Sequence, residues 1–295
     1  MVLPNFLIIG APKSGTTSLY YNLKKHPQIY MSPLKEIHFF HKHKDYIDHE
    51  DLSKYQNYFK NVNKESAIGE ATTTYLYSIN APGSIQRFIP NAKLIAVLRN
   101  PIDRAYSEYL MQYRNNRLPD NISEKDLFPY FSHLISEDSK SSLLQYGFYW
   151  KSLSRYTNIV EPNNLKIFLF ENLKHDTPRV LQDICRFLSV DDTYFLGNYS
   201  PTFNQAGIPK NKTIYSLLEH FRRTYGPGLS RYFPESTYET LRKLYVETRS
   251  RFLMSVNRVP QLPLHLRKQL IDIYFDDIME LQRFLNTDLT GWYQL

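Results

Sequence analysis

Residues 6–18 constrain the fold of this chain more than any other stretch. They read Phe-Leu-Ile-Ile-Gly-Ala-Pro-Lys-Ser-Gly-Thr-Thr-Ser, so four apolar residues lead into a tight turn and small hydroxyl residues then open a helical pattern. Backbone N–H groups at the start of such a helix, together with its positive dipole end, face an anion. The stretch therefore predicts a strand, a phosphate-binding loop and a helix.

The charge within this loop is displaced from its usual place. The spacing from Gly10 to Gly15, followed by two threonines, matches a P-loop with one substitution. A nucleoside triphosphatase carries lysine directly after the second glycine, whereas this chain has Thr16 there and its lysine, Lys13, inside the loop. The motif thus predicts a bound phosphate ester other than ordinary ATP.

A second phosphate site is predicted where another buried strand ends. In a P-loop nucleotide hydrolase such a strand delivers an aspartate that organises Mg²⁺. Here the apolar run Leu94–Leu98 delivers Arg99, whose forked guanidinium suits phosphate oxygens and cannot hold a metal. Ser107, two turns into the following helix, is placed to add a hydroxyl donor. Taken alone, Arg99 is equally explained as a surface residue before a helix capped by Asn100.

Apolar runs that alternate with helical patterns indicate the fold class. Strands are expected at 6–9, 94–98 and 165–170, with a weaker one at 67–68, and helices at 16–24, 101–115, 148–159, 178–188, 237–255 and 264–285. This alternation predicts an α/β fold with a P-loop-like central parallel sheet flanked by helices on both faces. Since no composition shift marks a linker, we expect a single domain over 1–295, with lid or insert segments at 40–64 and 116–142.

Charge and cysteine content limit the partners and the location. The net charge of +7 suits an anionic ligand or acceptor, although it equally describes an ordinary solvated surface. Acidic residues are interspersed throughout, so no nucleic-acid-binding tail is expected. The only cysteine, Cys185, forms no intramolecular disulfide, and no apolar stretch is long enough for a transmembrane segment. We therefore expect a cytoplasmic protein, with peripheral membrane attachment open if the acceptor is a lipid.

The two phosphate segments resemble one family. Residues 12–17 and 98–107 are similar to the 5′-phosphosulfate and 3′-phosphate motifs of sulfotransferases that use PAPS (3′-phosphoadenosine 5′-phosphosulfate). The branch most resembled contains heparan sulfate N- and 3-O-sulfotransferases and bacterial homologues. The resemblance implies PAPS as co-substrate, PAP as product and Arg99 and Ser107 at the 3′-phosphate. It also implies 5′-phosphate contacts from Lys13, Ser14, Gly15, Thr16, Thr17 and Ser18.

A third segment, residues 35–40 (Lys-Glu-Ile-His-Phe-Phe), is similar to one in which the glutamate serves that family as catalytic base. The resemblance therefore implies that Glu36 accepts the proton of the acceptor. Structurally, Glu36 is also explained as an ion-pair partner of Lys35 or Lys13. His38 is a second candidate, as an alternative base or as a residue that orients Glu36 or the acceptor.

No metal site is expected, although four histidines lie between residues 38 and 49. Their spacing fits no zinc pattern with cysteine support, because Cys185 is alone and distant in sequence. A ligand with two separated phosphates also needs no nucleotide-bound Mg²⁺. The expected site is therefore independent of metal.

Two further segments resemble the family more loosely. Residues 69–76 correspond to a segment that lines the acceptor cleft, but the heparan sulfate enzymes carry a lysine where this chain has Ala71. This departure argues against a highly sulfated glycan as acceptor. Residues 203–210 resemble a late loop that closes over the cofactor, which would bring Lys210 to the 3′-phosphate. A solvated loop lysine is the alternative for Lys210.

Together these segments predict in-line transfer of a sulfuryl group from PAPS to a hydroxyl or amine, with Lys13 stabilising the leaving phosphate and Glu36 as base. The acceptor is expected to be a carbohydrate, a lipid headgroup, a peptide tyrosine or a small molecule. One alternative is a P-loop small-molecule kinase, which Thr16 and Arg99 disfavour. Another is a non-catalytic nucleotide-binding scaffold, which would be indifferent to Glu36.

Overall fold

The computed structural model describes most of the chain. The described residues are 2–115, 117–119, 122–137, 141–199 and 259–295, with short pieces at 208–209, 214–215, 217–218, 220, 224, 237 and 254–255. Within these residues, no helix combines the length and the apolar character needed to cross a bilayer.

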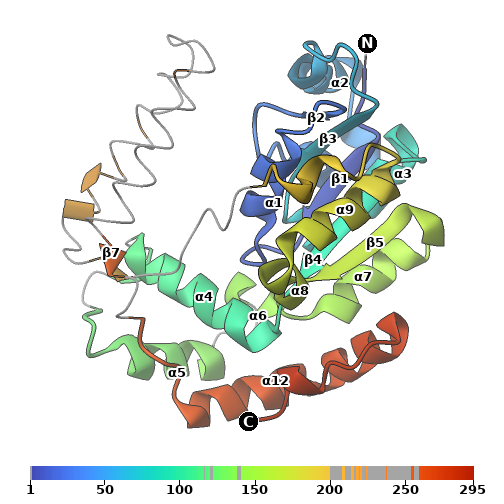
Figure 1. Ribbon diagram of the computed structural model, residues 1–295. Coiled ribbons are helices and arrows are strands. Elements are labelled where there is room, and N and C mark those ends of the chain that lie inside the picture. The colour runs from blue at the N-terminus through green and yellow to red at the C-terminus, as the bar shows by residue number, and fades with distance from the viewer. Residues whose placement is uncertain are drawn as a thin grey trace.

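A parallel five-stranded sheet forms the centre of the described structure (Figure 1). Its strands in sequence order are β1 (Phe6–Gly10), β2 (Ile29–Met31), β3 (Ala67–Ala71), β4 (Lys93–Leu98) and β5 (Leu165–Leu169). Their order across the sheet is β2-β3-β1-β4-β5, and every pair is parallel. The first strand therefore lies in the middle, between β3 and β4.

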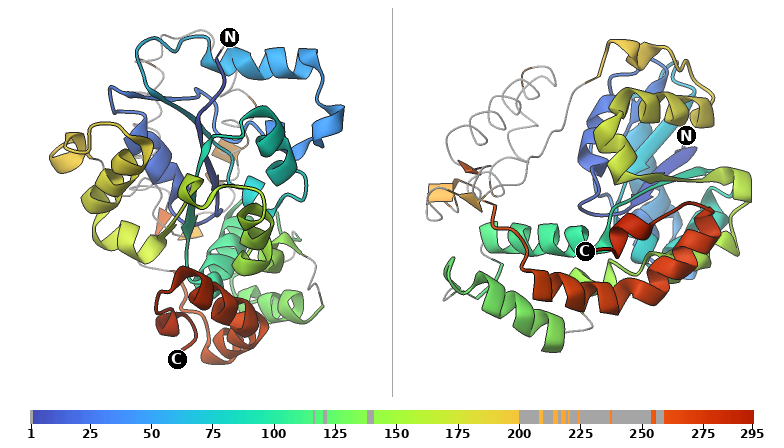
Figure 2. Two further views of the ribbon diagram at one scale, coloured as in Figure 1. Left: turned by 90° about the vertical axis from the view of Figure 1, so that its right-hand side faces the viewer. Right: turned by 60° about the horizontal axis from the view of Figure 1, so that its bottom comes forward.

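Helices surround this sheet, as the views in Figure 2 show. They are α1 (Thr16–Leu23), α2 (His49–Gln56), α3 (Ala81–Phe88), α4 (Pro101–Arg114), α5 (Leu127–Glu137), α6 (Ser142–Gln145), α7 (Tyr149–Thr157), α8 (Phe170–His175), α9 (Thr177–Leu188) and α12 (Leu264–Leu285). Short 3-10 turns η1 (Phe39–His41) and η4 (Tyr75–Tyr77) lie in the connections. A separate antiparallel pair is formed by β6 (Ile208–Pro209) and β7 (Met254–Ser255).

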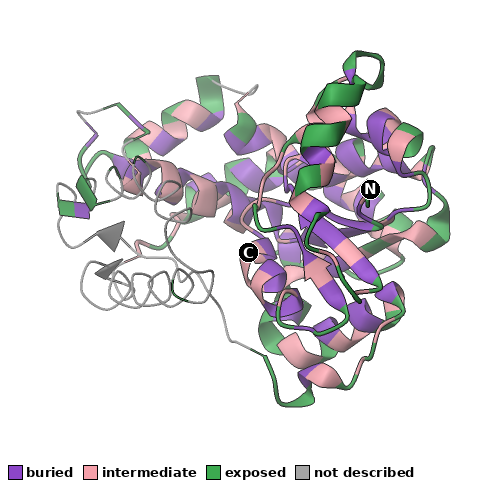
Figure 3. Cartoon of the chain, turned by 90° about the horizontal axis from the view of Figure 1, so that it is seen from above, coloured by how far each residue is buried: buried purple, intermediate pink, exposed green. Residues whose placement is uncertain are grey.

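Alternate side chains of the central strands enter two different cores. In β1, Leu7 and Ile9 pack in a core with residues of α3, α4, α7 and α12, whereas Phe6 and Ile8 pack in a core with residues of α1 and α9. Because successive side chains of a strand point to opposite faces, both faces of the sheet are covered. The buried residues accordingly run through the strands, and the exposed ones lie on outer helix surfaces and in loops (Figure 3). The predicted fold class is confirmed.

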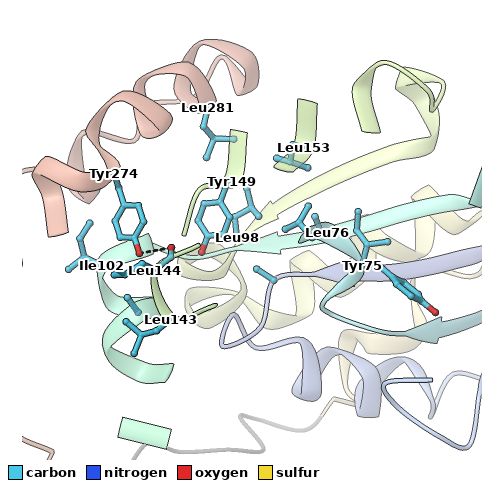
Figure 4. Packing of buried hydrophobic residues seen from close by; sticks show 14 of the residues in the cluster. Tyr75, Leu76, Leu98, Ile102, Leu143, Leu144, Tyr149, Leu153, Tyr274 and Leu281 are labelled. Atoms are coloured by element: carbon cyan, nitrogen blue, oxygen red, sulfur yellow. Dashed lines mark hydrogen bonds between the residues drawn. The ribbon is translucent and has the colours of Figure 1, made fainter. Parts of the chain in front are cut away.

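Helix α12 closes the outer side of the larger core. It packs on α4, α5 and α7. The Tyr274 hydroxyl donates to the Leu144 carbonyl at 2.9 Å (Figure 4). The carboxylate of Asp277 accepts the backbone N–H groups of Trp150 and Lys151, both at 2.9 Å. These two groups belong to the first turn of α7, where N–H groups lack intrahelical partners, so α12 caps α7 from outside.

The predicted elements agree with the structure where the apolar pattern is long. The strands expected at 6–9 and 94–98 are confirmed to within one residue, and the strand expected at 165–170 ends at Leu169 because Phe170 begins α8. The strand expected at 67–68 extends to Ala71. Strand β2 was not predicted, because its three residues are too few to show an alternation of apolar and polar side chains.

Some sequence expectations are left open by the described residues. The helix expected at 237–255 lies mostly outside them, apart from β7 at its end. Within 40–64, Phe40, Tyr55 and Phe59 are buried in the larger core, and 116–142 contains α5. The single domain over 1–295 stays a prediction.

We predict that Asp277→Ala lowers the free energy of unfolding by about 1–2 kcal/mol, because two first-turn N–H groups of α7 lose their acceptor. Urea denaturation followed by circular dichroism measures this change. The matched control is Asp276→Ala, since Asp276 is the exposed neighbour on the same helix. Equal losses in the two variants would show that Asp277 does not cap α7.

Candidate functional site

The loop after β1 has the backbone geometry of an anion cradle. Lys13 and Gly15 both have positive φ, 72° and 80°, and Gly15 is the N-cap of α1. A side chain at Gly15 would also be crowded, because an added Cβ would lie 3.0 Å from the Phe170 ring. The glycine therefore lets the loop turn sharply and pass close to the end of β5.

Several donors of this loop are available to a ligand. Ser14 is fully buried, and its Oγ has no hydrogen-bond partner within the described part of the chain. The N–H groups of Thr16, Thr17 and Ser18 lie in the first turn of α1, where no intrahelical carbonyl can accept them. A buried hydroxyl and a set of first-turn amides at one place fit a bound phosphate.

Lys13 is held within the protein near other cations. Its ammonium lies 3.3 Å from the sulfur of Met111, and the residue is only partly exposed. The pKa of Lys13 is lowered to about 8, mainly by burial; Arg114, Arg99 and Arg104 contribute to the lowering, and Glu108 opposes it. Met111, not a carboxylate, is the contact described for the Lys13 ammonium, an arrangement that leaves its charge available to an anionic ligand.

Arg99 lies beside this loop. It follows β4 directly, and its guanidinium donates to the Lys13 carbonyl at 3.2 Å. The same guanidinium lies over the Phe170 ring, 4.9 Å from its centroid. Since β1 and β4 are parallel neighbours, their carboxyl ends bring Lys13 and Arg99 together. Ser107 lies further along α4, partly exposed.

Glu36 is tied to the end of β3. Its backbone N–H donates to the Ala71 carbonyl at 2.8 Å. Its carboxylate accepts the N–H of Thr73 at 2.9 Å and the hydroxyl of Thr73 at 2.8 Å. Lys35 also pairs with the carboxylate at 2.6 Å, so one of the two ion-pair partners considered for Glu36 is present. The Glu36 side chain remains 30% exposed, which leaves it accessible to an acceptor.

His38 lies exposed on the same loop as Glu36. Its Nδ1 is 3.4 Å from the Thr74 hydroxyl, which lies 2.8 Å from His41 Nε2. The two imidazole rings are 5.3 Å apart. Burial lowers the pKa of His41, His38 lowers it further, and Glu36 opposes the change. His38 and His41 thus lie in the electrostatic surroundings of Glu36.

The described residues contain no group of three His, Cys, Asp or Glu side chains arranged to hold a metal ion. Lys210 lies outside the described residues, next to β6, which contacts α4. A contact between Lys210 and a phosphate therefore stays a prediction.

The sequence did not indicate the roles of two residues that support this site, Thr73 and Phe170. Thr73 holds the Glu36 carboxylate, but the two residues are 37 positions apart and no local pattern links them. Phe170 supports both Arg99 and the turn at Gly15. Its position directly after β5 is a usable signal, because parallel strands place their carboxyl ends at one edge.

Comparison with known proteins agrees with this geometry. Residues 3–201 match the sulfotransferase domain family, so the chain belongs to that family. The membrane-associated sulfotransferase kil1 of Dictyostelium discoideum is 36% identical over 143 residues, covering 47% of this chain and 29% of that protein. The bifunctional heparan sulfate N-deacetylase/N-sulfotransferase 4 of Mus musculus is 29% identical over 290 residues, covering 91% of this chain and 32% of that protein. The chain thus spans less than a third of the length of these curated relatives.

A solved structure shows the same fold. The sulfotransferase from Alicyclobacillus acidocaldarius aligns with a TM-score of 0.67 at 24% identity, covering 100% of both chains.

We predict that Lys13 titrates near pH 8, since burial disfavours its charged form. Reductive methylation with ¹³C-formaldehyde followed by NMR should show one dimethyl-lysine signal with this midpoint, while exposed lysines titrate near pH ~10. The signal should be missing from Lys13→Met. A spectrum in which every lysine titrates near pH ~10 would contradict the burial of this amine.

Proposed function

We propose that this protein transfers a sulfuryl group from PAPS to a hydroxyl or amine of an acceptor that is a carbohydrate or a small molecule. One observation carries the proposal: Lys13 and Arg99 meet at the carboxyl ends of β1 and β4, where the Arg99 guanidinium donates to the backbone carbonyl of Lys13 at 3.2 Å. Two cationic anchors at neighbouring strand ends suit a nucleotide with a phosphate at the 5′ and at the 3′ position. The sulfotransferase family and the resemblance of both motifs to PAPS-binding segments support the same ligand.

The residues present fit this donor. The unpartnered hydroxyl of Ser14 and the first-turn amides of α1 would hold the 5′-phosphate. Arg99, braced by the Phe170 ring, would bind the 3′-phosphate together with Ser107. These residues bind and orient the donor.

Glu36 and Lys13 would perform the two charge-handling parts of the transfer. As the acceptor oxygen or nitrogen forms its bond to sulfur, Glu36 accepts the acceptor's proton. The bond between sulfur and the bridging phosphate oxygen breaks at the same time, and PAP leaves with the extra negative charge. Lys13 stabilises that charge electrostatically. His38, exposed beside Glu36, is the alternative base or an acceptor-orienting residue.

The acceptor class is inferred from a relative and from Ala71. One relative bears heparan sulfate in its name, which favours a carbohydrate here. Ala71 is buried and carries no charge, so we propose a glycan of low sulfation or a small molecule. Lipid headgroups and peptide tyrosines are tested beside it. We propose a cytoplasmic location, because the only cysteine is a buried free thiol, as a reducing compartment allows.

Calorimetry and a transfer assay test the proposal together. PAP should bind without added metal and more tightly than ATP–Mg²⁺ or ADP, whereas a kinase would prefer ATP–Mg²⁺. Incubation with ³⁵S-labelled PAPS and a panel of desulfated glycans, lipids and peptides should then label an acceptor. Binding of PAP without transfer to any acceptor would indicate a nucleotide-binding scaffold.

We predict that Glu36→Gln lowers kcat by about 10²–10⁴-fold, the usual contribution of a general base, with little change in the Kd for PAP. Steady-state assays with labelled PAPS and calorimetry measure the two constants. The control is Glu50→Gln, because Glu50 lies exposed on α2 and pairs only with Lys54 among the contacts described for it. Parallel losses of kcat and PAP affinity would instead assign Glu36 a structural role.

We predict that Arg99→Ala raises the KM for PAPS by about 10–100-fold, since charge-assisted hydrogen bonds to a phosphate are lost, and changes kcat less. Arg99→Lys should recover only part of the loss, because an ammonium lacks the forked donor geometry. Arg87→Ala is the control, as Arg87 pairs with Asp45 on the exposed surface. An unchanged KM for PAPS in Arg99→Ala would remove this residue from the donor site.

A further inference from the structure

A buried carboxylate lies beneath the loop that carries Glu36. Glu70, in β3, is fully buried. Three hydroxyls donate to its carboxylate: Tyr55 at 2.9 Å, Thr72 at 2.7 Å and Tyr75 at 2.9 Å. Above pH about 7, where the Glu70 carboxyl group is ionised, it can only accept, so it dictates where the hydrogens of all three hydroxyls point.

Two of these hydroxyls also accept hydrogen bonds from backbone N–H groups of the loop 36–40. The Thr72 oxygen accepts the backbone N–H of Ile37 at 3.0 Å and that of His38 at 3.3 Å. The Tyr75 oxygen accepts the N–H of Phe40 at 3.2 Å. Because the hydrogens of both hydroxyls are turned toward Glu70, their lone pairs are free to face the loop.

The loop needs this support. Glu36 and His38 both have φ of 63°, in the left-handed region that non-glycine residues seldom occupy. Such residues persist when the surrounding contacts determine their conformation. The N–H groups of Ile37, His38 and Phe40 belong to His38 itself or to residues that follow Glu36 and His38. The hydroxyls therefore accept hydrogen bonds where the backbone conformation is strained.

We propose that Glu70 is a positioning residue for the transfer: through the hydroxyls of Thr72 and Tyr75 it holds the loop 36–40 in the conformation that presents Glu36 and His38. This inference rests on the proposed function of Glu36. Glu70 is buried and touches no substrate, so it acts only through the loop.

Tyr55 provides a matched control within the same cluster. Its hydroxyl donates to Glu70 at the same distance as that of Tyr75, 2.9 Å, but no loop N–H donates to it in the contacts described for it. Its ring stacks on Phe39 at 4.0 Å, a contact that a phenylalanine retains. Tyr55→Phe and Tyr75→Phe therefore remove the same bond to Glu70, while only Tyr75→Phe also removes an acceptor from the loop.

The first readout is amide hydrogen exchange at Ile37, His38 and Phe40, measured by NMR. Thr72→Val should speed exchange at Ile37 and His38, and Tyr75→Phe at Phe40, by roughly ten-fold, the factor of one net hydrogen bond. Glu70→Gln should speed all three. Tyr55→Phe should change none of them, and Thr72→Ser should restore the wild-type rates.

The second readout is the transfer of ³⁵S from labelled PAPS to desulfated heparan sulfate. Glu70→Gln, Thr72→Val and Tyr75→Phe should lower kcat by about 10–100-fold, the usual cost of a small misplacement of a catalytic group. The KM for PAPS and the calorimetric Kd for PAP should stay within about threefold of wild type, because no donor contact is lost. Tyr55→Phe and Thr72→Ser should keep kcat near wild type.

The outcomes separate this inference from the proposed function. If Tyr55→Phe matches Tyr75→Phe in kcat and exchange, the cluster only stabilises the fold and the inference is wrong. Unchanged exchange in Glu70→Gln would overturn it as well. A wild-type protein that transfers no label contradicts the proposed function for this acceptor. The exchange comparison needs no acceptor and still decides whether Glu70 holds the loop.

Discussion

The meeting of four parallel strand ends at one edge of the sheet is the constraint on which the site depends. β1 leads into the Lys13 loop, β3 into Thr72 and Thr73, β4 into Arg99 and β5 into Phe170. None of these segments is a neighbour of another in sequence. The backbone hydrogen bonds between the strands set the relative positions of these segments. The two hydrophobic cores pack against the two faces of the sheet and stabilise it.

Arg99 and Glu70, two of the charged residues at this edge, have neutral partners, whereas Glu36 pairs with Lys35. Arg99 lies on an aromatic ring and donates to a carbonyl, and Glu70 is surrounded by three hydroxyls. Hydroxyls, carbonyls and ring faces offset the cost of removing a charge from water without neutralising it. The arginine thus keeps its charge for a ligand, whereas the buried glutamate uses its charge to order the surrounding hydroxyls. Burial and, to a smaller extent, the nearby Glu36 raise the pKa of Glu70 to about 7, and the three hydrogen bonds oppose this rise.

The parts of the site that could be predicted are those written in short sequence patterns. The turn at Gly15, the cation after β4 and the capped start of α4 each depend on a few consecutive residues, and all three are present. For the contact of Phe170 with Arg99, the only signal in the sequence was the position of Phe170 directly after β5. The contact of Glu36 with Thr73 could not be predicted, because it joins segments that only the folded sheet brings together. The same holds for the hydroxyls around Glu70: the segment 69–76 was recognised, but the direction of each hydroxyl depends on tertiary packing. The described residues leave the placement of Lys210 untested.

The lowered pKa of Lys13 has a consequence for which anions the loop retains. Near pH 8 a substantial fraction of the free protein carries a neutral amine there, so the resting loop is less attractive to stray anions than its sequence implies. A ligand with dense negative charge raises the pKa of Lys13, so the amine of Lys13 takes up a proton as the ligand binds. The loop would then select for highly charged anions, because only such an anion raises the pKa of Lys13 enough to protonate it. A weakly charged competitor would bind beside a partly neutral amine and gain less electrostatic attraction.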